Sequence, residues 1–131
     1  MSKSLMVLIA GPYRSGTDDD PQRMRENLDR LESVALELWN RGHLPIIGEW
    51  LALPLIRAAG SRRVGDEVWD SYGYPVADRI IDRCDAVLRM PGASKGADGD
   101  VRRANELGIP VFRSVNELPA GSPREVRDLR P

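Results

Sequence analysis

The segment at residues 5–10, Leu-Met-Val-Leu-Ile-Ala, is apolar at every position and ends at Gly11-Pro12. A strand with one wet face alternates apolar and polar side chains, whereas a strand covered on both faces is apolar throughout. Strands of the second kind belong to parallel sheets, in which a helical crossover joins one strand to the next. This segment therefore predicts an α/β domain built on a parallel sheet.

Helix and strand signals alternate along the rest of the chain. Asp20 is placed to cap a helix that starts with Pro21, and Gly42 is placed to end it after apolar residues at helical spacing. The other expected elements are a strand at 44–47, a helix at 50–59 that Pro54 interrupts or delays, a long polar loop at 60–73, a helix at 75–83, a strand at 86–90, a helix at 97–107 and a strand at 109–112. This order predicts a doubly wound parallel sheet of four to five strands in a single domain, 1–113, followed by a poorly ordered tail, 114–131.

The composition narrows the classes of partner. With 19 basic and 20 acidic residues the formal net charge is −1, so the chain lacks the broad positive field that holds a nucleic acid. Its one cysteine, Cys84, fits a reducing, cytoplasmic compartment, and we expect a small buried hydrophobe there. With one histidine, His43, expected at the surface or at a helix end, we expect no metal site. The apolar run at 5–10 is too short for a signal peptide or a membrane span.

In a doubly wound sheet the ligand lies beyond the carboxyl ends of the strands. The loop after the first strand places glycines beside an arginine and two hydroxyl groups; its residues are Gly11, Pro12, Tyr13, Arg14, Ser15 and Gly16. Glycines let backbone N–H groups approach a phosphate closely, and Arg14 can add a bidentate contact while Tyr13 offers a ring or a hydroxyl. An ordinary tight turn between strand and helix explains the same glycines, so the loop alone leaves both interpretations open.

A second loop, at residues 94–100, leads into the helix at 97–107. Its sequence is Ser-Lys-Gly-Ala-Asp-Gly-Asp. We expect Asp98 to cap the helix and Asp100 to lie in its first turn, near the first loop. The spacing alone favours a role for Asp100 in complementing the helix dipole over a role in binding a ligand.

Further candidates follow the second strand and fill the long polar loop. Glu49 and Trp50 come directly after the strand at 44–47, where a carboxylate and a ring can meet a sugar and a base. Core packing explains Trp50 equally well. Trp69, Tyr72 and Tyr74 can stack on a base, although aromatic residues in such a loop more often anchor it.

Three segments share their order and spacing with one enzyme superfamily. The first is 8–13, Leu-Ile-Ala-Gly-Pro-Tyr, and the second is 84–88, Cys-Asp-Ala-Val-Leu. The third contains Ser94, Gly96, Ala97, Asp100, Ala104, Gly108, Ile109, Pro110 and Val111. Together they resemble the nucleoside 2-deoxyribosyltransferase superfamily, which includes the deoxynucleoside-monophosphate N-glycosidases. The resemblance spans residues 5–112, and its motifs are specific in combination rather than singly.

The resemblance implies a flavodoxin-like domain that cleaves or transfers the N-glycosidic bond of a nucleoside or nucleoside 5′-monophosphate. In the superfamily a glutamate attacks the anomeric carbon, and the matching residue here is Asp100. The superfamily also holds the sugar with an acid eight residues before the position of Asp85; this chain has Ala77 there, and Asp78 is the nearest acid. The candidate catalytic residues are therefore Asp100, Asp78 and Tyr13.

Ligands and partners also follow from the resemblance. It implies a phosphate site at 13–16, a base near Trp50 or the aromatic residues of the long loop, and a sugar beside Asp100, with Glu49, Ser94 and Gly96 completing the site. It implies no metal or organic cofactor, and a homodimer or higher homo-oligomer. Because aspartate is one methylene shorter than glutamate, a catalytically silent module that binds a nucleotide or a sugar phosphate stays open. A related enzyme that cleaves NAD or another nucleotide stays open as well.

Overall fold

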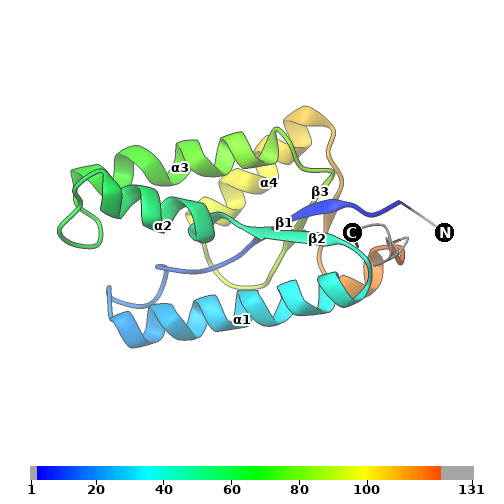
Figure 1. Cartoon of the computed structure of the whole chain (residues 1–131), viewed down its shortest axis with the longest axis horizontal. Helices are drawn as coiled ribbons and strands as arrows, with labels where there is room; N and C mark the ends of the chain where they lie inside the picture. Colours follow the sequence, from blue (N-terminus) through cyan, green and yellow to red (C-terminus); the bar gives the residue numbers. More distant parts are fainter. Residues whose placement is uncertain (1–2, 122–131) are drawn as a thin grey trace, which may run out of the picture.

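A parallel sheet of four strands forms the centre of the protein. The computed structural model describes residues 3–121. The strands are β1 (Met6–Ala10), β2 (Leu44–Ile47), β3 (Ala86–Arg89) and β4 (Val111–Phe112), in the spatial order β2-β1-β3-β4. All neighbouring strands run parallel, and Leu8 of β1 lies opposite Ile46 on one side and Val87 on the other. The predicted α/β, flavodoxin-like fold is confirmed (Figure 1).

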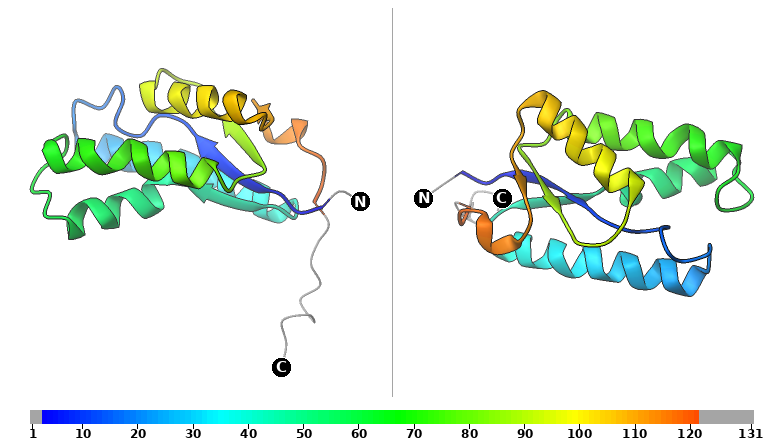
Figure 2. Two further views of the ribbon diagram at one scale, coloured as in Figure 1. Left: turned by 90° about the horizontal axis from the view of Figure 1, so that it is seen from above. Right: turned by 180° about the vertical axis from the view of Figure 1, so that it is seen from behind.

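Helices cover both faces of this sheet. They are α1 (Pro21–Asn40), α2 (Gly48–Ala58), α3 (Glu67–Ile81) and α4 (Lys95–Leu107). The first, α1, packs over Val7 and Ile9, whereas α3 and α4 pack on the opposite face over Leu8 and Val87. Helix α2 lies beside α3 on that second face (Figures 1 and 2). The chain thus winds away from β1 in both directions, and the crevice at this switch point opens between the carboxyl ends of β1 and β3.

The local sequence explains why α1 forms as predicted. The carboxylate of Asp20 accepts a hydrogen bond from the backbone N–H of Arg23 at 3.2 Å, and Pro21 occupies the first helical position, where no N–H is required. The helix ends at Asn40, and Gly42 then turns the chain toward β2 with a φ of 91°. The side chains that α1 buries are Met24, Asn27, Leu28, Leu31, Ala35 and Leu38.

Residues 60–73 do not form the long loop that the sequence predicts. Helix α3 begins at Glu67, because the carboxylate of Asp66 accepts hydrogen bonds from the backbone N–H groups of Trp69 and Arg62, each at 3.0 Å. These bonds lower the pKa of Asp66 to about 2. The helix then continues through Pro75, which the sequence places near its start. Because Pro75 has no backbone N–H, the helix lacks one hydrogen bond at this position. The helix that starts at the Asp66 cap nevertheless continues past Pro75 to Ile81.

The start of α4 also differs from the prediction. Its N-cap is Ser94, whose hydroxyl accepts a hydrogen bond from the backbone N–H of residue 97 at 3.1 Å. Asp98 is not the cap, because its carboxylate lies 2.9 Å from a guanidinium nitrogen of the buried Arg89. The helix therefore begins at Lys95, and Asp100 lies in its second turn rather than in its first.

The remaining boundaries shift by a few residues. Helix α2 begins at Gly48 and contains Pro54 in its interior. Strand β3 ends at Arg89, and α3 ends at Ile81. Strand β4 is confined to residues 111–112, because the backbone N–H of Ile109 bonds to a carbonyl at the end of α4 at 2.8 Å and so belongs to the helix turn.

The segment 114–121 packs against the protein core, which corrects the prediction of a poorly ordered tail over this range. A short 3-10 helix, η1 (Val115–Glu117), leads to Leu118, which is 2% exposed. His43 is likewise buried rather than at the surface: it accepts the N–H of Leu5 at 3.1 Å, and its other ring nitrogen lies 2.6 Å from the carbonyl oxygen of Pro119. The predicted tail at 122–131 lies outside the described residues.

Two further observations bear on chemistry and environment. Cys84 is buried, as predicted, and burial is the main cause that raises the pKa of its thiol to about 11. The thiol therefore stays protonated and packs as a small apolar side chain. Within residues 3–121, none of the helices has the combination of length and apolar sequence that crossing a membrane requires.

Candidate functional site

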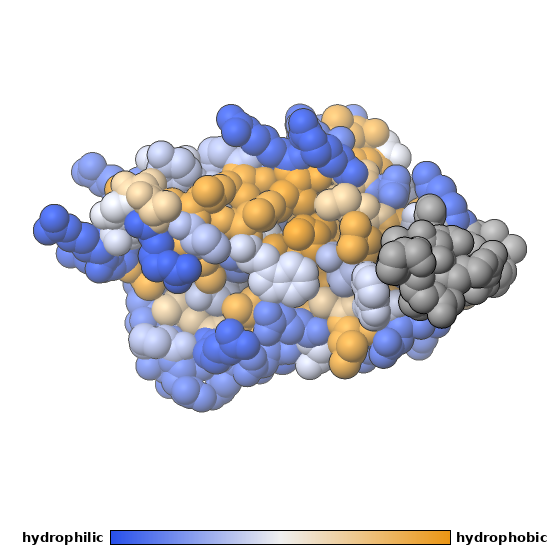
Figure 3. Space-filling model, in the orientation of Figure 1, coloured by the Kyte–Doolittle hydropathy of each residue, from blue (hydrophilic) through white to orange (hydrophobic). Residues whose placement is uncertain are grey.

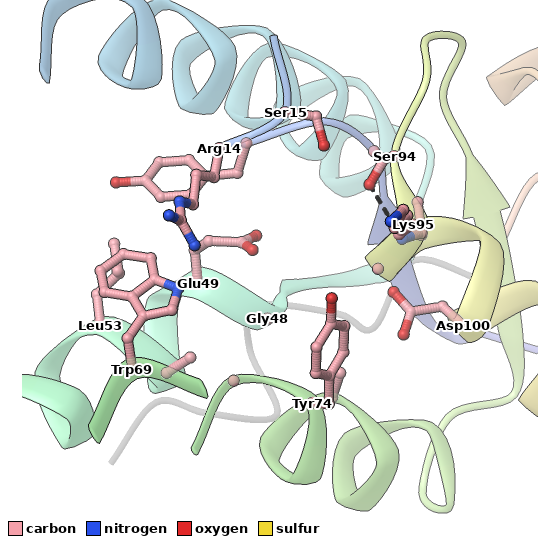
Figure 4. Close-up of a pocket in the computed structure, with 18 of the residues that line it drawn as sticks. Arg14, Ser15, Gly48, Glu49, Leu53, Trp69, Tyr74, Ser94, Lys95 and Asp100 are labelled. Carbon is pink, nitrogen blue, oxygen red and sulfur yellow. Dashed lines mark hydrogen bonds between the residues drawn. The ribbon is translucent and has the colours of Figure 1, made fainter. Parts of the chain in front are cut away.

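A cavity of about 440 Å³ lies beyond the carboxyl end of β1, between the start of α2 and the start of α4, and so beside the switch point between β1 and β3. Its walls come from the end of β1 and the following loop, from the first turns of α2 and α4, and from the first half of α3 (Figure 4). The lining combines apolar side chains with a smaller number of charged and hydroxyl groups, which is the composition of small-molecule sites.

The structure brings together most of the residues predicted for the site. The cavity lining includes Gly11, Tyr13, Arg14, Ser15, Glu49, Ser94, Gly96 and Asp100. These residues come from three separate segments of the chain. Their convergence agrees with the expectation that the two loops and the end of β2 meet at one edge of the sheet.

Four predicted residues lie elsewhere. Pro12 packs near Gly92, and the backbone at Gly16 makes a turn with a φ of 74°. The indole of Trp50 points away from the cavity and donates a hydrogen bond to Glu32 at 2.8 Å, so this side chain is not part of the predicted base site. Asp78 lies outside the cavity as well.

Asp78 lines a second hollow on the surface between α3 and α4, and Asp100 lines this hollow too. Asp100 thus lies between the main cavity and the second hollow. Asp78 does not face the space where the first loop and Glu49 meet, but its charge contributes to raising the pKa of Asp100.

Helix α3 supplies a wall of the cavity, and this wall contains Trp69 and Tyr74, two of the three aromatic residues that the sequence offers for stacking on a base. Trp69, Asp70, Gly73 and Tyr74 line the site, whereas Tyr72 points outward and is 42% exposed. Residues 69, 73 and 77 follow one another at a spacing of four, which places them on one face of a helix. That periodicity is present in the sequence, and it becomes informative only once the segment is known to be helical.

Arg14 joins the first loop to α3 across the mouth of the cavity. Its guanidinium makes a two-pronged contact with the carboxylate of Asp19, at 2.6 and 3.2 Å, and lies 6.0 Å from the ring centre of Trp69. The hydrogen bond with Asp19 is the main cause that raises the pKa of Arg14. Gly65 makes this position possible, because a Cβ there would clash with the guanidinium end of the Arg14 side chain.

Two carboxylates point into the cavity from opposite sides, Glu49 from α2 and Asp100 from α4 (Figure 4). Burial, followed by the negative charges of Glu49 and Asp78, raises the pKa of Asp100 to about 7. Burial also raises the pKa of Glu49. Within residues 3–121 neither carboxylate forms an ion pair, because Arg14 pairs with Asp19 and the buried Arg89 pairs with Asp98. Lys95 lines the same cavity, and the charge of Arg89 lowers the pKa of Asp100, but the causes that raise this pKa are larger.

Tyr13 is a further polar residue that lines the cavity. Its backbone carbonyl accepts a hydrogen bond from the side-chain amide of Asn27 at 2.7 Å, which ties the first loop to α1. Burial and then the charge of Glu49 raise the pKa of the Tyr13 phenol, so the hydroxyl keeps its proton and can act as a hydrogen-bond donor.

The arrangement offers two carboxylates that compete for protons, a neutral phenol and a charged guanidinium around one partly apolar space. Carboxylates poised in this way can act as a nucleophile and as a general acid or base. Among residues 3–121, no group of three or more His, Cys, Asp or Glu side chains is arranged to hold a metal ion. The chain matches no protein-family model, no curated protein and no solved structure.

Proposed function

We propose that the protein cleaves or transfers the N-glycosidic bond of a nucleoside or nucleoside 5′-monophosphate, with Asp100 as the nucleophile. The observation that carries this proposal is the pair of unneutralised carboxylates that face each other in the cavity at the switch point of the sheet. The motif resemblance in residues 5–112 supports the same chemistry. The proposal places a phosphate near Arg14, the base against Trp69 and Tyr74, and the sugar between Glu49 and Asp100.

The reaction uses both acids. An oxygen of Asp100 bonds to the anomeric carbon as the bond from that carbon to the base nitrogen breaks, and the bonding electrons go to the base. Glu49, in its protonated form, gives its proton to the departing base. Water or a second base then attacks the anomeric carbon and releases Asp100, while Glu49 takes a proton from the attacking group. The reacting form is thus the carboxylate pair that holds one proton, with that proton on Glu49. Because the pKa of Asp100 is raised to about 7, Asp100 competes with Glu49 for this proton, and the proposal requires the proton to move to Glu49 before the attack begins.

The other predicted residues act on binding. Tyr13, as a neutral phenol, can donate a hydrogen bond to a sugar or phosphate oxygen. Ser15, Ser94 and Lys95 face the cavity from the two loops and add donors at the side of the phosphate (Figure 4). Asp78 acts through its charge on Asp100 rather than through contact with the sugar. We also propose that the protein works in the cytoplasm, where its buried thiol stays reduced.

The test is release of free base from nucleosides, nucleoside 5′-monophosphates and NAD, followed by chromatography. We expect the wild-type protein and Asp18→Asn, an exposed control, to release base, and Asp100→Asn to release none while binding the same nucleotide. Glu49→Gln should lose at least about tenfold in rate on ordinary nucleotides but little on an N7-methylated purine nucleotide, whose base leaves without needing a proton. Absence of base release from every nucleotide that binds would refute the enzymatic proposal.

A binding module on the same fold is the second candidate. It is favoured by Asp100, whose side chain is shorter than the glutamate of the superfamily pattern. Calorimetry and chromatography together distinguish the two candidates. For a silent module, calorimetry detects binding of a nucleotide or sugar phosphate, and chromatography detects no free base after long incubation. Release of nicotinamide from NAD alone would instead favour an NAD-cleaving enzyme.

A further inference from the structure

The charges that line the cavity do not cancel. Arg14 and Asp19 pair with each other at 2.6 Å. Of the other charged residues in the lining, Lys95 is the one cation, and within residues 3–121 none of the three acids forms an ion pair. These acids are Glu49, Asp70 and Asp100. Even when Glu49 and Asp100 hold one proton between them, two negative charges face one positive charge, and a ligand that brings a positive charge balances the excess.

Helix α2 directs its single acid inward. Glu49 turns into the cavity, and the other charged residue of the helix, Arg57, lies in the last turn. The outer side of the helix carries Leu51 and Leu55, which are 46% and 48% exposed and contribute to the hydrophobic surface in Figure 3. A surface helix normally turns its charges to water. Because burial raises the pKa of Glu49, its inward placement is unfavourable for folding and is better explained by a ligand.

Two aromatic rings lie on the same side of the site as these acids. Trp69 and Tyr74 project from α3 into the cavity, which Glu49 and Asp100 enter from α2 and α4 (Figure 4). The face of an aromatic ring is negative and attracts cations. The Trp69 ring already attracts one, since the guanidinium of Arg14 lies 6.0 Å from its centre. A flat, positively charged ring can therefore stack on these side chains while the carboxylates balance its charge.

The groups that favour an anion fit a different part of the ligand. Helices α2 and α4 both start at the cavity, and the N-terminal end of a helix attracts negative charge. With Ser15 and Lys95, these helix ends suit the 5′-phosphate of the proposed substrate. The backbone at the start of α2 also lowers the pKa of Glu49, but burial raises it by more. A nucleotide with a neutral base thus leaves the acids without a counter-charge, whereas a nucleotide with a cationic base satisfies both sets of groups.

We propose that the substrate is an N-glycoside whose base carries a positive charge, such as a pyridinium or an N-alkylated purine nucleotide. This inference rests on the function proposed above and narrows its substrate class. The bond from the anomeric carbon to the ring nitrogen breaks, its electron pair goes to that nitrogen, and the base leaves as a neutral molecule without taking a proton. Glu49 then stays ionised during this step and takes a proton from the water that later releases the sugar from Asp100. The positive charge that moves onto the sugar lies between two carboxylates.

Binding of a matched pair of analogues tests the charge of the base. The probe is carbocyclic nicotinamide mononucleotide, in which a methylene replaces the ring oxygen of the sugar, so that no oxocarbenium ion can form and the base is not released. The comparison compound is the same molecule with a dihydronicotinamide ring, which is neutral, and both compounds carry the same phosphate. We expect calorimetry at pH 7.5 to give the cationic form a Kd at least about tenfold lower than that of the neutral form.

Charge variants identify the groups responsible for this preference. Asp70→Asn and Glu49→Gln each remove a negative charge, and each should reduce the preference for the cationic form about threefold or more. Lys95→Gln removes the opposing positive charge and should increase the preference. The matched control is Asp18→Asn, because the Asp18 side chain is 96% exposed and lies outside the cavity lining, so its preference should equal that of the wild type. Circular dichroism establishes that each variant is folded.

The outcomes separate this inference from the proposed reaction. Equal affinity of the wild type for the two analogues would overturn the inference, and so would a preference that neither Asp70→Asn nor Glu49→Gln reduces. Release of base from neutral nucleotides by a protein that binds both analogues equally would leave the reaction standing and remove the cationic substrate class. A preference for the cationic analogue without release of base from any nucleotide would refute the reaction, and the cavity would then be a binding site for cationic nucleotides.

Discussion

Replacing Asp100 by asparagine should stabilise the protein at pH 8. The carboxylate is largely buried and faces the charges of Glu49 and Asp78, so the folded state resists its ionisation and its pKa rises from 3.8 to about 7. Between these two pH values the folded chain holds a proton that the unfolded chain has lost. Stability therefore falls as the pH rises through this window, and the full penalty is present above pH 7. An asparagine side chain carries no charge and removes the penalty.

The pKa difference sets the magnitude. The rise from 3.8 to about 7 corresponds to about 4 kcal/mol at ~1.36 kcal/mol per pKa unit. The asparagine amide must still be desolvated, and residual structure in the unfolded chain reduces the difference, so we expect a gain of about 2–3 kcal/mol at pH 8. For a domain of this size that gain raises the melting temperature by roughly 5–10 °C. At pH 4 the gain should be close to zero.

Urea denaturation of wild type and variant at pH 4, 5, 6, 7 and 8 measures this difference. Asp18→Asn is the matched control, because its side chain is 96% exposed and its φ of 52° is one that asparagine also adopts. The control should show no pH-dependent change relative to wild type. If Asp100→Asn is less stable than wild type at pH 8, the carboxylate has a structural role such as complementing the helix dipole, and the argument from burial is wrong.

Two further predictions concern the mouth of the cavity and the C-terminal segment. Arg14→Ala should weaken binding of a nucleoside monophosphate by about 1.5–3 kcal/mol and binding of the corresponding nucleoside far less. Asp19→Asn, which frees Arg14 from its ion pair, should strengthen binding of the monophosphate. Calorimetry that shows equal losses of affinity for both ligands in Arg14→Ala would remove the phosphate assignment. His43→Phe should lower the free energy of unfolding in urea by about 1–3 kcal/mol, because Leu5 and Pro119 lose their buried partner, and an unchanged value would show that these bonds contribute nothing.

Strong local signals allowed the centre of the fold to be predicted from the sequence. The unbroken apolar run before Gly11 identified β1 as a strand covered on both faces, and Asp20 with Pro21 identified the start of α1. Both depend on interactions within a few residues, which sequence patterns capture. The sequence predicted parallel strands joined by helices but not their order, because the connection from β2 contains two helices and passes β1 to reach β3.

Helix α3 shows where such signals mislead. Pro75 is a common first residue of a helix, and the polar stretch before it resembles a loop. In the structure the cap is nine residues earlier, at Asp66, whose carboxylate gathers backbone N–H groups from both sides. The packing of α3 against α2 and α4 compensates for the hydrogen bond that Pro75 cannot make. Tertiary contacts of this kind are not visible in a single sequence, so Trp69 and Tyr74 were assigned to a loop rather than to one side of a helix.

The acids of the site were named from the sequence, but their relation to each other was not. Sequence spacing placed Asp100 and Glu49 at the same edge of the sheet, and the structure adds that they face one cavity without a neutralising cation. The structure also shows that Asp78 lies outside that cavity. The side chain of Trp50 lies outside the cavity as well, because its indole is hydrogen-bonded to Glu32. These distinctions depend on side-chain direction, which a shift of one residue along a helix alters by about 100°.

The structural roles available to an acid near the start of α4 are already filled by other residues. Ser94 caps the helix, and Asp98 lies in the first turn and neutralises the buried Arg89. Asp100 is one turn too late for either role, and its ionisation opposes folding because the carboxylate is largely buried and, secondly, because Glu49 lies across the same cavity. A residue that lowers stability, has no structural partner and faces a cavity at the switch point of a parallel sheet fits a role in binding or chemistry. The same reasoning extends to Glu49, because burial raises the pKa of its carboxyl group as well. The two acids therefore support the proposed reaction as a pair, and neither one supports it alone.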